Sequence, residues 1–190
     1  ALAQGATFDI IPVAYNPALQ KRVRTLLEEP VYQNYFNVEY GVGLDHRTWP
    51  LADLVAYHQI GARQVVNIPS GVTTIIVPAG SCHAATSILC GLALHGRQVA
   101  VHLVGLGPFR GPWLAERLAL LGLTFQYTGA ADRGYMGTVR SGWWEVPVFY
   151  HDLIGSGYVT YQDRWAETMD GIEFHPTYEA KMMRWLREVA

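Results

Sequence analysis

Short apolar runs alternate along this chain with amphipathic segments and with turns rich in glycine and proline. Strands are expected at residues 73–77, 98–104 and 123–127, because each run is dense in β-branched and aromatic side chains. Helices are expected at 81–94 and 112–121, where apolar residues recur at helical spacing. Strands that are apolar on both faces and alternate with helices predict an α/β fold with a mainly parallel sheet.

Residues that start or end helices and strands predict further elements on either side of this region. Asn16 and Pro17 form a helix start, with a capping side chain followed by proline at the first helical position, and Pro30 ends that helix. The remaining expectations are a strand at 7–13, a helix beginning near Pro50, a glycine-rich loop at 128–142, a strand at 143–150 and a helix at 177–189.

The charge and hydrophobicity of the chain indicate which kinds of partner to expect. The 190 residues are 50% hydrophobic and 16% charged with a net charge of -2, which is typical of a soluble domain that buries a core. The scattered basic residues give no footprint for nucleic acid or for an anionic membrane, so a small molecule is the expected partner. The most hydrophobic region is interrupted by His95, Arg97 and His102. It is therefore shorter than the roughly 20 apolar residues that a membrane span requires.

The two cysteines, Cys82 and Cys90, are predicted to stay reduced. Eight positions on a helix separate them by about 12 Å, which is too far for a disulfide. Reduced thiols fit a cytoplasmic protein. Zinc is not expected at Cys82 and His83, because no further Cys or His stands at the spacing of a zinc site.

The opening of the chain, residues 1–6, has the pattern of the last turn of a helix with Gly5 just after its end. A helix this short does not form alone, so the chain is expected to begin inside a folded unit. A trimmed start on an otherwise complete small domain remains the alternative.

A candidate anion site follows the strand at 73–77. Gly80, Ser81, Cys82, His83 and Ala84 form a turn of mostly small residues that leads into a helix, where free backbone N–H groups and the helix dipole attract anions. The alternative is that the turn is an ordinary connection in which Ser81 caps the helix.

The second candidate segment, residues 170–181, places Tyr178 and Glu179 at the start of the last helix. A carboxylate is favoured there by the helix dipole in any case, and Tyr178 has an alternative role as a core residue. Each segment alone is therefore compatible with a purely structural role.

Together and in this order, the two segments resemble the fold-type-II pyridoxal-phosphate enzymes, the family of tryptophan synthase beta chains. The closest resemblance is to the aminocyclopropane-carboxylate deaminase and D-cysteine desulfhydrase branch, whose strand-glycine-serine loop is similar to residues 75–81. The late motif of that branch, E-G-I-x-x-D-P-V-Y-E-G-K, is similar to residues 170–181. The resemblance implies a three-layer fold with helices on both faces of the sheet. Residues 1–45 are then a remnant of the small domain, and 46–190 the large cofactor-binding domain.

The resemblance also implies roles for individual residues. Glu179 falls where the family places the acid that faces the pyridine nitrogen, and Tyr178 falls on an active-site tyrosine. The phosphate loop falls on Gly80, Ser81, Cys82, His83 and Ala84. The implied activity is that of a lyase or deaminase that acts on an amino acid, or an amino-acid-like group, through a carbanion stabilised by pyridoxal phosphate. A homodimer, or association with a missing N-terminal part, is the implied assembly.

This chain departs from the family in two ways. Cys82, His83 and Ala84 carry side chains where the family loop is richer in glycine. The Schiff-base lysine of the family lies upstream, and neither Lys21 nor Lys181 matches it.

The lysine gap leaves two main interpretations of the chain. It is either the C-terminal piece of a longer enzyme or a lysine-less, non-catalytic relative. A third hypothesis is a nucleotide-binding domain, because Gly105 and Gly107 follow a strand, although their spacing misses the usual fingerprint.

Overall fold

The computed structural model describes residues 16–32, 34, 47–131 and 134–189. The strand expected at 7–13 and the helix end expected at 1–6 lie outside the described residues. The chain divides into two compact units, Ala1–Gly43 and Leu44–Ala190. Each unit is described by itself, and the assignment of residues 1–45 and 46–190 to a small and a large domain stays a prediction.

The first unit contains the helix α1, Asn16–Leu27, and a short 3-10 helix, Pro30–Tyr32. The helix begins at Asn16, as the asparagine-proline pair predicts, and the chain leaves it just before Pro30. Lys21 is exposed on this helix.

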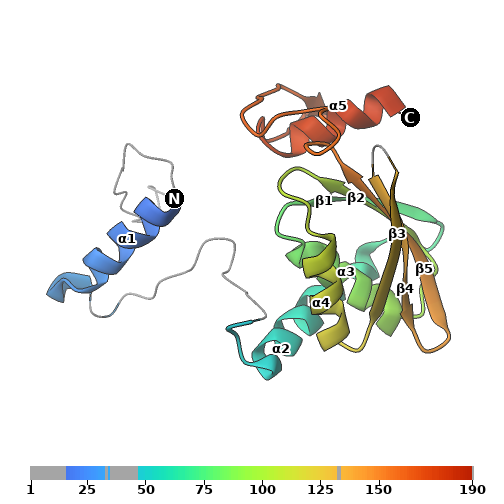
Figure 1. Cartoon of the computed structure of the whole chain (residues 1–190), viewed down its shortest axis with the longest axis horizontal. Coiled ribbons are helices and arrows are strands. Elements are labelled where there is room, and N and C mark those ends of the chain that lie inside the picture. Colours follow the sequence, from blue (N-terminus) through green and yellow to red (C-terminus); the bar gives the residue numbers. More distant parts are fainter. Residues whose placement is uncertain (1–15, 33, 35–46, 132–133, 190) are drawn as a thin grey trace. The chain divides into compact units, whose positions relative to one another are not determined.

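A five-stranded sheet forms the centre of the second unit, in the order β1-β2-β5-β4-β3 (Figure 1). The strands are β1, Thr74–Ala79; β2, Ala100–Gly105; β3, Thr124–Ala131; β4, Gly134–Ser141; and β5, Trp144–Asp152. The strands predicted at 73–77, 98–104, 123–127 and 143–150 are thus confirmed, each with its ends shifted by a few residues.

The sheet is mixed, which corrects the prediction of a mainly parallel sheet. β2 pairs in parallel with β1 and with β5, whereas β4 is antiparallel to both β5 and β3. The antiparallel strand comes from the segment that was expected to be a loop, 128–142. Gly137 of this strand has a packing reason, since a Cβ there would meet the carbonyl oxygen of Gln126 at 2.5 Å.

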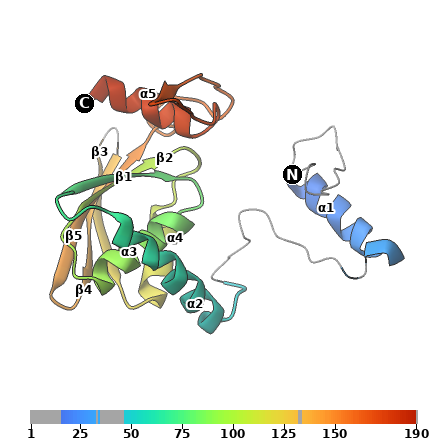
Figure 2. The same cartoon turned by 180° about the vertical axis from the view of Figure 1, so that it is seen from behind.

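Helices cover one face of the sheet (Figures 1 and 2). They are α2, Leu51–Ala62; the short 3-10 helix η4, Arg63–Asn67; α3, His83–Leu94; and α4, Gly111–Leu120. α3 packs closely on α2 because Gly91 faces the Ala62 carbonyl, and a Cβ there would collide with it. The core between these helices and the sheet includes Val77, Leu103 and Val148. The predicted helices at 81–94 and 112–121, and the helix near Pro50, are therefore confirmed.

The opposite face of the sheet is open in the part of the chain that the structure describes. Ile76 is 41% exposed and Met136 is 57% exposed, and Phe149 is half-buried between them in the same row of paired residues. Among the described residues, a helix covers this face only at its carboxyl end, where the C-terminal helix packs on Val104 and His151, so the expectation of helices on both faces is met in part.

The C-terminal part of the chain forms a second, smaller core at the carboxyl ends of β2 and β5. After β5 the chain runs through a two-stranded ribbon, Thr168–Met169 and Ile172–Glu173, to the last helix α5, Glu179–Val189. Met182 and Met183 of α5 pack on Val104, Leu106 and Leu153. Figure 1 shows α5 in red, beyond the ends of the strands. Within the described residues, every helix is too short or too polar to cross a membrane.

Candidate functional site

The carboxyl ends of β1, β2 and β5 meet at one edge of the sheet. Their last residues, Ala79, Gly105 and Asp152, are paired across the three strands. Because these strands run in parallel, the segments that follow them all emerge at this edge, which is where open α/β sheets bind ligands. Both predicted site segments lie here, one after β1 and the other on α5.

The predicted phosphate loop is a tight turn between β1 and α3. Cys82 adopts a left-handed backbone conformation with φ of 60°, and its carbonyl accepts hydrogen bonds from the backbone and the side chain of Thr86 at 2.9 and 2.8 Å. Helix α3 begins at His83 without any side-chain cap, so the expectation that Ser81 caps the helix is wrong. The N–H groups of the first turn are therefore left without a side-chain acceptor.

Part of this loop is exposed to solvent, and Cys82 within it is buried. Gly80, Ser81 and Ala84 are exposed, and a Cβ on Gly80 would meet nothing within 4 Å. Cys82 is buried below them. Burial raises the pKa of the Cys82 thiol to about 12, although the nearby guanidinium groups of Arg110 and Arg117 act to lower it. The thiol is thus protonated, and two cations lie close enough to favour an anion at the loop.

His83 links the loop to a polar cluster beneath α2. Its Nδ1 is hydrogen-bonded to the guanidinium of Arg117, which stacks over Trp113 with 3.5 Å between the guanidinium carbon and the ring centre. Burial and the charge of Arg117 lower the pKa of His83 to about 4, so the imidazole is neutral at pH 7. On α2, His58 Nδ1 lies 2.9 Å from Ser87 Oγ.

Metal binding finds no support at these residues. Among the described residues there is no group of three or more His, Cys, Asp and Glu side chains arranged to hold a metal ion. Cys82 and Cys90 are both free thiols, as predicted.

The second site segment places Tyr178 and Glu179 at the start of α5. The Tyr178 hydroxyl lies 2.7 Å from the hydroxyl of Tyr161, so one of the two donates to the other. The Oε2 atom of Glu179 is buried and has no hydrogen-bond partner within the described part of the protein. A buried carboxylate oxygen without a donor is unusual, because leaving it unsatisfied costs about 1–3 kcal/mol or more.

Lys181, the lysine of the late motif, is fully buried. Its Nζ donates to the carbonyl oxygens of Thr160 and Tyr161 at 2.7 and 3.1 Å. Burial lowers the pKa of this amine, and the charge of Asp163 opposes that shift. Lys181 thus fastens the segment that carries Tyr161, and its amine is occupied by two acceptors.

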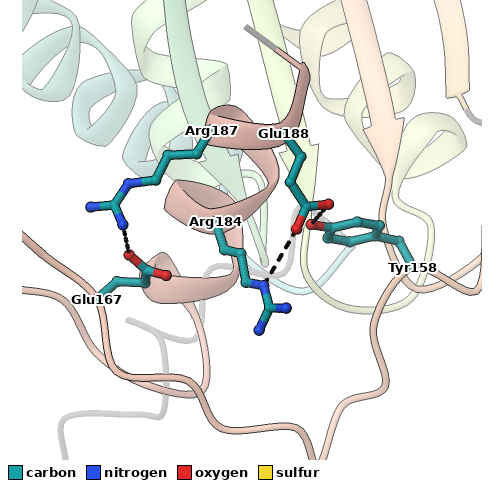
Figure 3. Close-up of polar contacts among 5 residues, drawn as sticks. All are labelled: Tyr158, Glu167, Arg184, Arg187 and Glu188. Atoms are coloured by element: carbon teal, nitrogen blue, oxygen red, sulfur yellow. Dashed lines mark hydrogen bonds and ion pairs between the residues drawn. The ribbon is translucent and has the colours of Figure 1, made fainter.

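Charged contacts hold the 153–178 segment against α5 (Figure 3). The hydroxyl of Tyr158 donates to Glu188 at 2.6 Å, and Arg184 pairs with the same carboxylate at 3.4 Å. The neighbouring residue Arg187 pairs with Glu167 at 2.6 Å. These contacts fix the path of the chain between β5 and the residues at the start of α5.

Both site segments therefore lie near the same edge of the sheet. The phosphate loop leaves β1, and α5 packs on the residues that end β2 and follow β5. A separation of less than ~15 Å between the Glu179 carboxylate and the backbone nitrogens of residues 81–84, which one bound cofactor requires, stays a prediction.

The glycines that suggested a dinucleotide-binding fold, Gly105 and Gly107, do not support it in the structure. A Cβ on Gly105 would lie 2.7 Å from the ring of Tyr150, so packing alone requires glycine at this position. Gly107 faces open space, and α4 begins only at Gly111.

Sequence reasoning missed several residues that the fold brings together. His102 Nδ1 and His151 Nε2 lie 2.9 Å apart, on strands whose pairing could not be read from the chain. Arg117, Tyr161 and His58 were missed for the same reason, because each acts across elements far apart in sequence. The available signal was the histidine inside the apolar run of β2, since a polar group in such a strand needs a partner.

The fold defines an α/β domain with an uncapped helix start after β1 and a half-buried glutamate at the start of α5. No family model matches the chain, and no solved structure matches it. The chain is similar to an O-seryl-dTMP PLP-dependent decarboxylase of Salmonella phage ViI, with 32% identity over 219 aligned residues. The alignment takes in 97% of this chain and 51% of that protein, so the chain spans about half the length of this relative.

Proposed function

We propose that this chain is part of a pyridoxal-phosphate-dependent enzyme that breaks a bond to the α-carbon of an amino acid or amino-acid-like group. The proposal depends on the alignment with a protein named as a PLP-dependent decarboxylase. That alignment covers 97% of this chain at 32% identity. The name of the relative favours decarboxylation over deamination. Membership of the fold-type-II enzymes, and of the aminocyclopropane-carboxylate deaminase branch, is part of the same proposal.

The residues present fit this cofactor at both ends. The turn from Gly80 to Ala84 offers backbone N–H groups at an uncapped helix start, near Arg110 and Arg117, which suits a phosphate. At the other end, the buried and unpartnered Oε2 of Glu179 suits the N–H of a protonated pyridine ring. When bound, pyridoxal phosphate supplies an electron sink that weakens the bonds to the α-carbon of the amine it holds.

Tyr178 is the candidate for moving a proton near the substrate. Its hydroxyl is hydrogen-bonded to that of Tyr161, so one oxygen donates while the other accepts and keeps its own proton for a further partner. Lys181 keeps Tyr161 in place through the carbonyl of that residue. In this proposal Glu179 holds a proton on the ring nitrogen and Tyr178 delivers or removes one at the substrate.

The Schiff-base lysine has no candidate in this chain. Lys21 is exposed on α1, and the amine of Lys181 is held by two carbonyl oxygens. We propose that the lysine belongs to the portion of a longer protein that this chain does not span. The alternative, a lysine-less relative with a binding role, predicts cofactor binding without turnover in every form of the protein.

The substrate proposed is an amino acid carried on a nucleotide. The relative is named for O-seryl-dTMP, which joins a serine to a thymidine nucleotide. For this chain, the same class of substrate places an amino acid at Tyr178 and Glu179 and leaves the nucleotide to be bound elsewhere.

The proposal is tested with pyridoxine phosphate, which has the ring nitrogen and phosphate of the cofactor but no aldehyde, so its binding requires no lysine. Calorimetry should detect binding to this chain. Glu179→Gln should weaken it about ten- to a hundredfold, since a charge-assisted hydrogen bond contributes about 1.5–3 kcal/mol. Glu173→Gln is the matched control, because Glu173 is exposed. Equal affinity of both variants, or no binding at all, contradicts the proposal.

A second measurement addresses the lysine. The chain is mixed with pyridoxal phosphate and reduced with borohydride, and the labelled residues are mapped. We expect no specific labelling of Lys21 or Lys181. Stoichiometric labelling of Lys181 would show that this residue is the Schiff-base lysine after all.

A further inference from the structure

A hollow of about 720 Å³ lies between α5 and the open face of the sheet. Its walls include His102 and His151 from the sheet, Trp185 and Glu188 from α5, and Tyr158 from the turn after β5. The volume falls in the range of small-molecule sites, about 300–1,000 Å³. None of these residues belongs to the loop at Gly80 or to the pair at Tyr178 and Glu179.

Flat rings line this hollow. The imidazoles of His102 and His151 lie edge to edge in nearly one plane, with 10° between their planes, 5.1 Å between their centres and 2.9 Å between the facing nitrogens. The ring of Phe149 lies 4.6 Å from that of His102, and the ring of Trp185 lies 4.6 Å from that of His151. Such a series of rings favours a flat aromatic ligand that stacks against them.

The two imidazoles are neutral at pH 7. Burial lowers the pKa of both rings, and burial together with the neighbouring His102 lowers the pKa of His151 to about 4. With a single N–H···N hydrogen bond between them, the pair presents no cation to a phosphate. The hollow therefore favours an uncharged ring over an anion.

The polar group at the rim is the carboxylate of Glu188. It accepts from Tyr158 and Arg184, and its side chain is still 49% exposed (Figure 3). A carboxylate has about four acceptor positions, so it can accept a further N–H from a ligand. It also repels a phosphate. A neutral ring with an N–H donor on its edge, such as the imide of a pyrimidine, meets both conditions.

The distance along α5 suits one substrate that reaches both sites. Tyr178 immediately precedes α5, and Trp185 lies seven residues later within the helix. At 1.5 Å per residue they are separated by about 10 Å along the axis. Both side chains also pack in the same small core. An amino acid joined by a short linker to a pyrimidine has roughly this length.

We propose that this hollow binds the pyrimidine base of a nucleotide-linked amino acid, with its phosphate directed toward solvent. The proposal rests on the proposed function, because it assigns a site to the nucleotide of that substrate. The base stacks on Trp185 and the histidine pair, and its N–H donates to Glu188. The amino acid extends along α5 toward Tyr178.

Thymidine is the probe, because it carries the base without a phosphate and needs no cofactor. Its binding to the 190-residue chain is followed by NMR through the indole N–H signals of the six tryptophans, with the Trp185 signal assigned from Trp185→Phe. We expect saturable shifts centred on Trp185. Glu188→Gln should weaken binding about tenfold, because it removes the charged acceptor at the exposed end of a helix. Trp143→Phe is the control, since Trp143 is 84% exposed in the β4–β5 turn.

The outcomes separate this inference from the proposed function. Thymidine binding that is unchanged in Glu188→Gln, or the absence of any saturable shift at Trp185, overturns the pyrimidine site, whatever pyridoxine phosphate does. Thymidine binding that is weakened about tenfold in Glu188→Gln and unchanged in Trp143→Phe supports it, even where the cofactor analogue fails to bind. A tighter fit for adenosine than for thymidine also overturns the assignment to a pyrimidine.

Discussion

The two faces of the central sheet carry similar side chains in different surroundings. On the face toward α3, the row Val77, Leu103 and Tyr150 is closed to solvent. On the other face, the adjacent row of Ile76, His102 and Phe149 lies partly in contact with solvent. Parallel strands are normally covered on both faces. The covered row therefore accounts for stability, whereas the half-open row contains His102, which lines the proposed pyrimidine site.

The helical layer and the open face of the sheet each contain a pair of neighbouring histidines. His58 and His83 stack between α2 and α3, with 6.5 Å between their ring centres, and they are embedded among Ser87 and Arg117. His102 and His151 lie edge to edge beside the hollow at α5. In the first pair, His58 is hydrogen-bonded to Ser87 and His83 to Arg117. The second pair has a ring face and an opening of its own.

The largest effect is expected for Leu103→Ala, because Leu103 is fully buried in the middle of the covered row. Truncating a buried leucine costs about 2–5 kcal/mol through lost burial and the cavity left behind. Urea unfolding followed by circular dichroism measures this loss. A loss below about 1 kcal/mol would show that the covered face packs more loosely than the structure indicates.

Most of the covered face could be predicted from the sequence, because its strands and helices have clear apolar periods and glycine or proline boundaries. Strand β4 could not, because its sequence, GYMGTVRS, has the composition of a loop and forms a strand only through pairing on both sides. Tertiary pairing overrides local propensity in such a segment.

Of the candidate site, only the positions of its residues in the fold can be compared with the prediction. Tyr178 and Glu179 were placed at the start of the last helix by their motif, and the structure has them there. The left-handed conformation of Cys82 could not be predicted, since non-glycine residues adopt it rarely. The pair of His102 and His151 depends on the register between two strands that are 49 residues apart, which the sequence does not reveal.

A smaller loss of stability is expected for Lys181→Met, which removes the buried amine of α5. The carbonyls of Thr160 and Tyr161 would lose their donor, at a cost of about 1–3 kcal/mol in the free energy of unfolding. Lys21→Met is the matched control, because Lys21 is exposed and should tolerate the change. Equal midpoints of urea unfolding in the two variants would contradict a structural role for Lys181.

A milder change is expected on lowering the pH from 7 to 6. Burial lowers the pKa of His58 to about 3 and that of His83 and His151 to about 4, below the ordinary value of 6.5. The unfolded chain therefore takes up protons below about pH 6.5 that the folded chain does not, and the free energy of unfolding falls as pH decreases toward about 4. Unfolding midpoints at a series of pH values test this, and a flat profile between pH 7 and 5 would contradict it.

The smallest effect is expected for Ile76→Thr, which changes the open row while keeping a β-branched side chain on the strand. Ile76 is 41% exposed, so the free energy of unfolding should change by no more than about 0.5 kcal/mol. The matched comparison is Val77→Thr on the same strand, where the side chain is only 6% exposed and the new hydroxyl enters the core. Urea unfolding of the two variants measures the difference between the faces directly. A loss at Ile76 as large as that at Val77 would show that the open face is covered in solution, and the contrast between a stabilising face and a binding face would then fail.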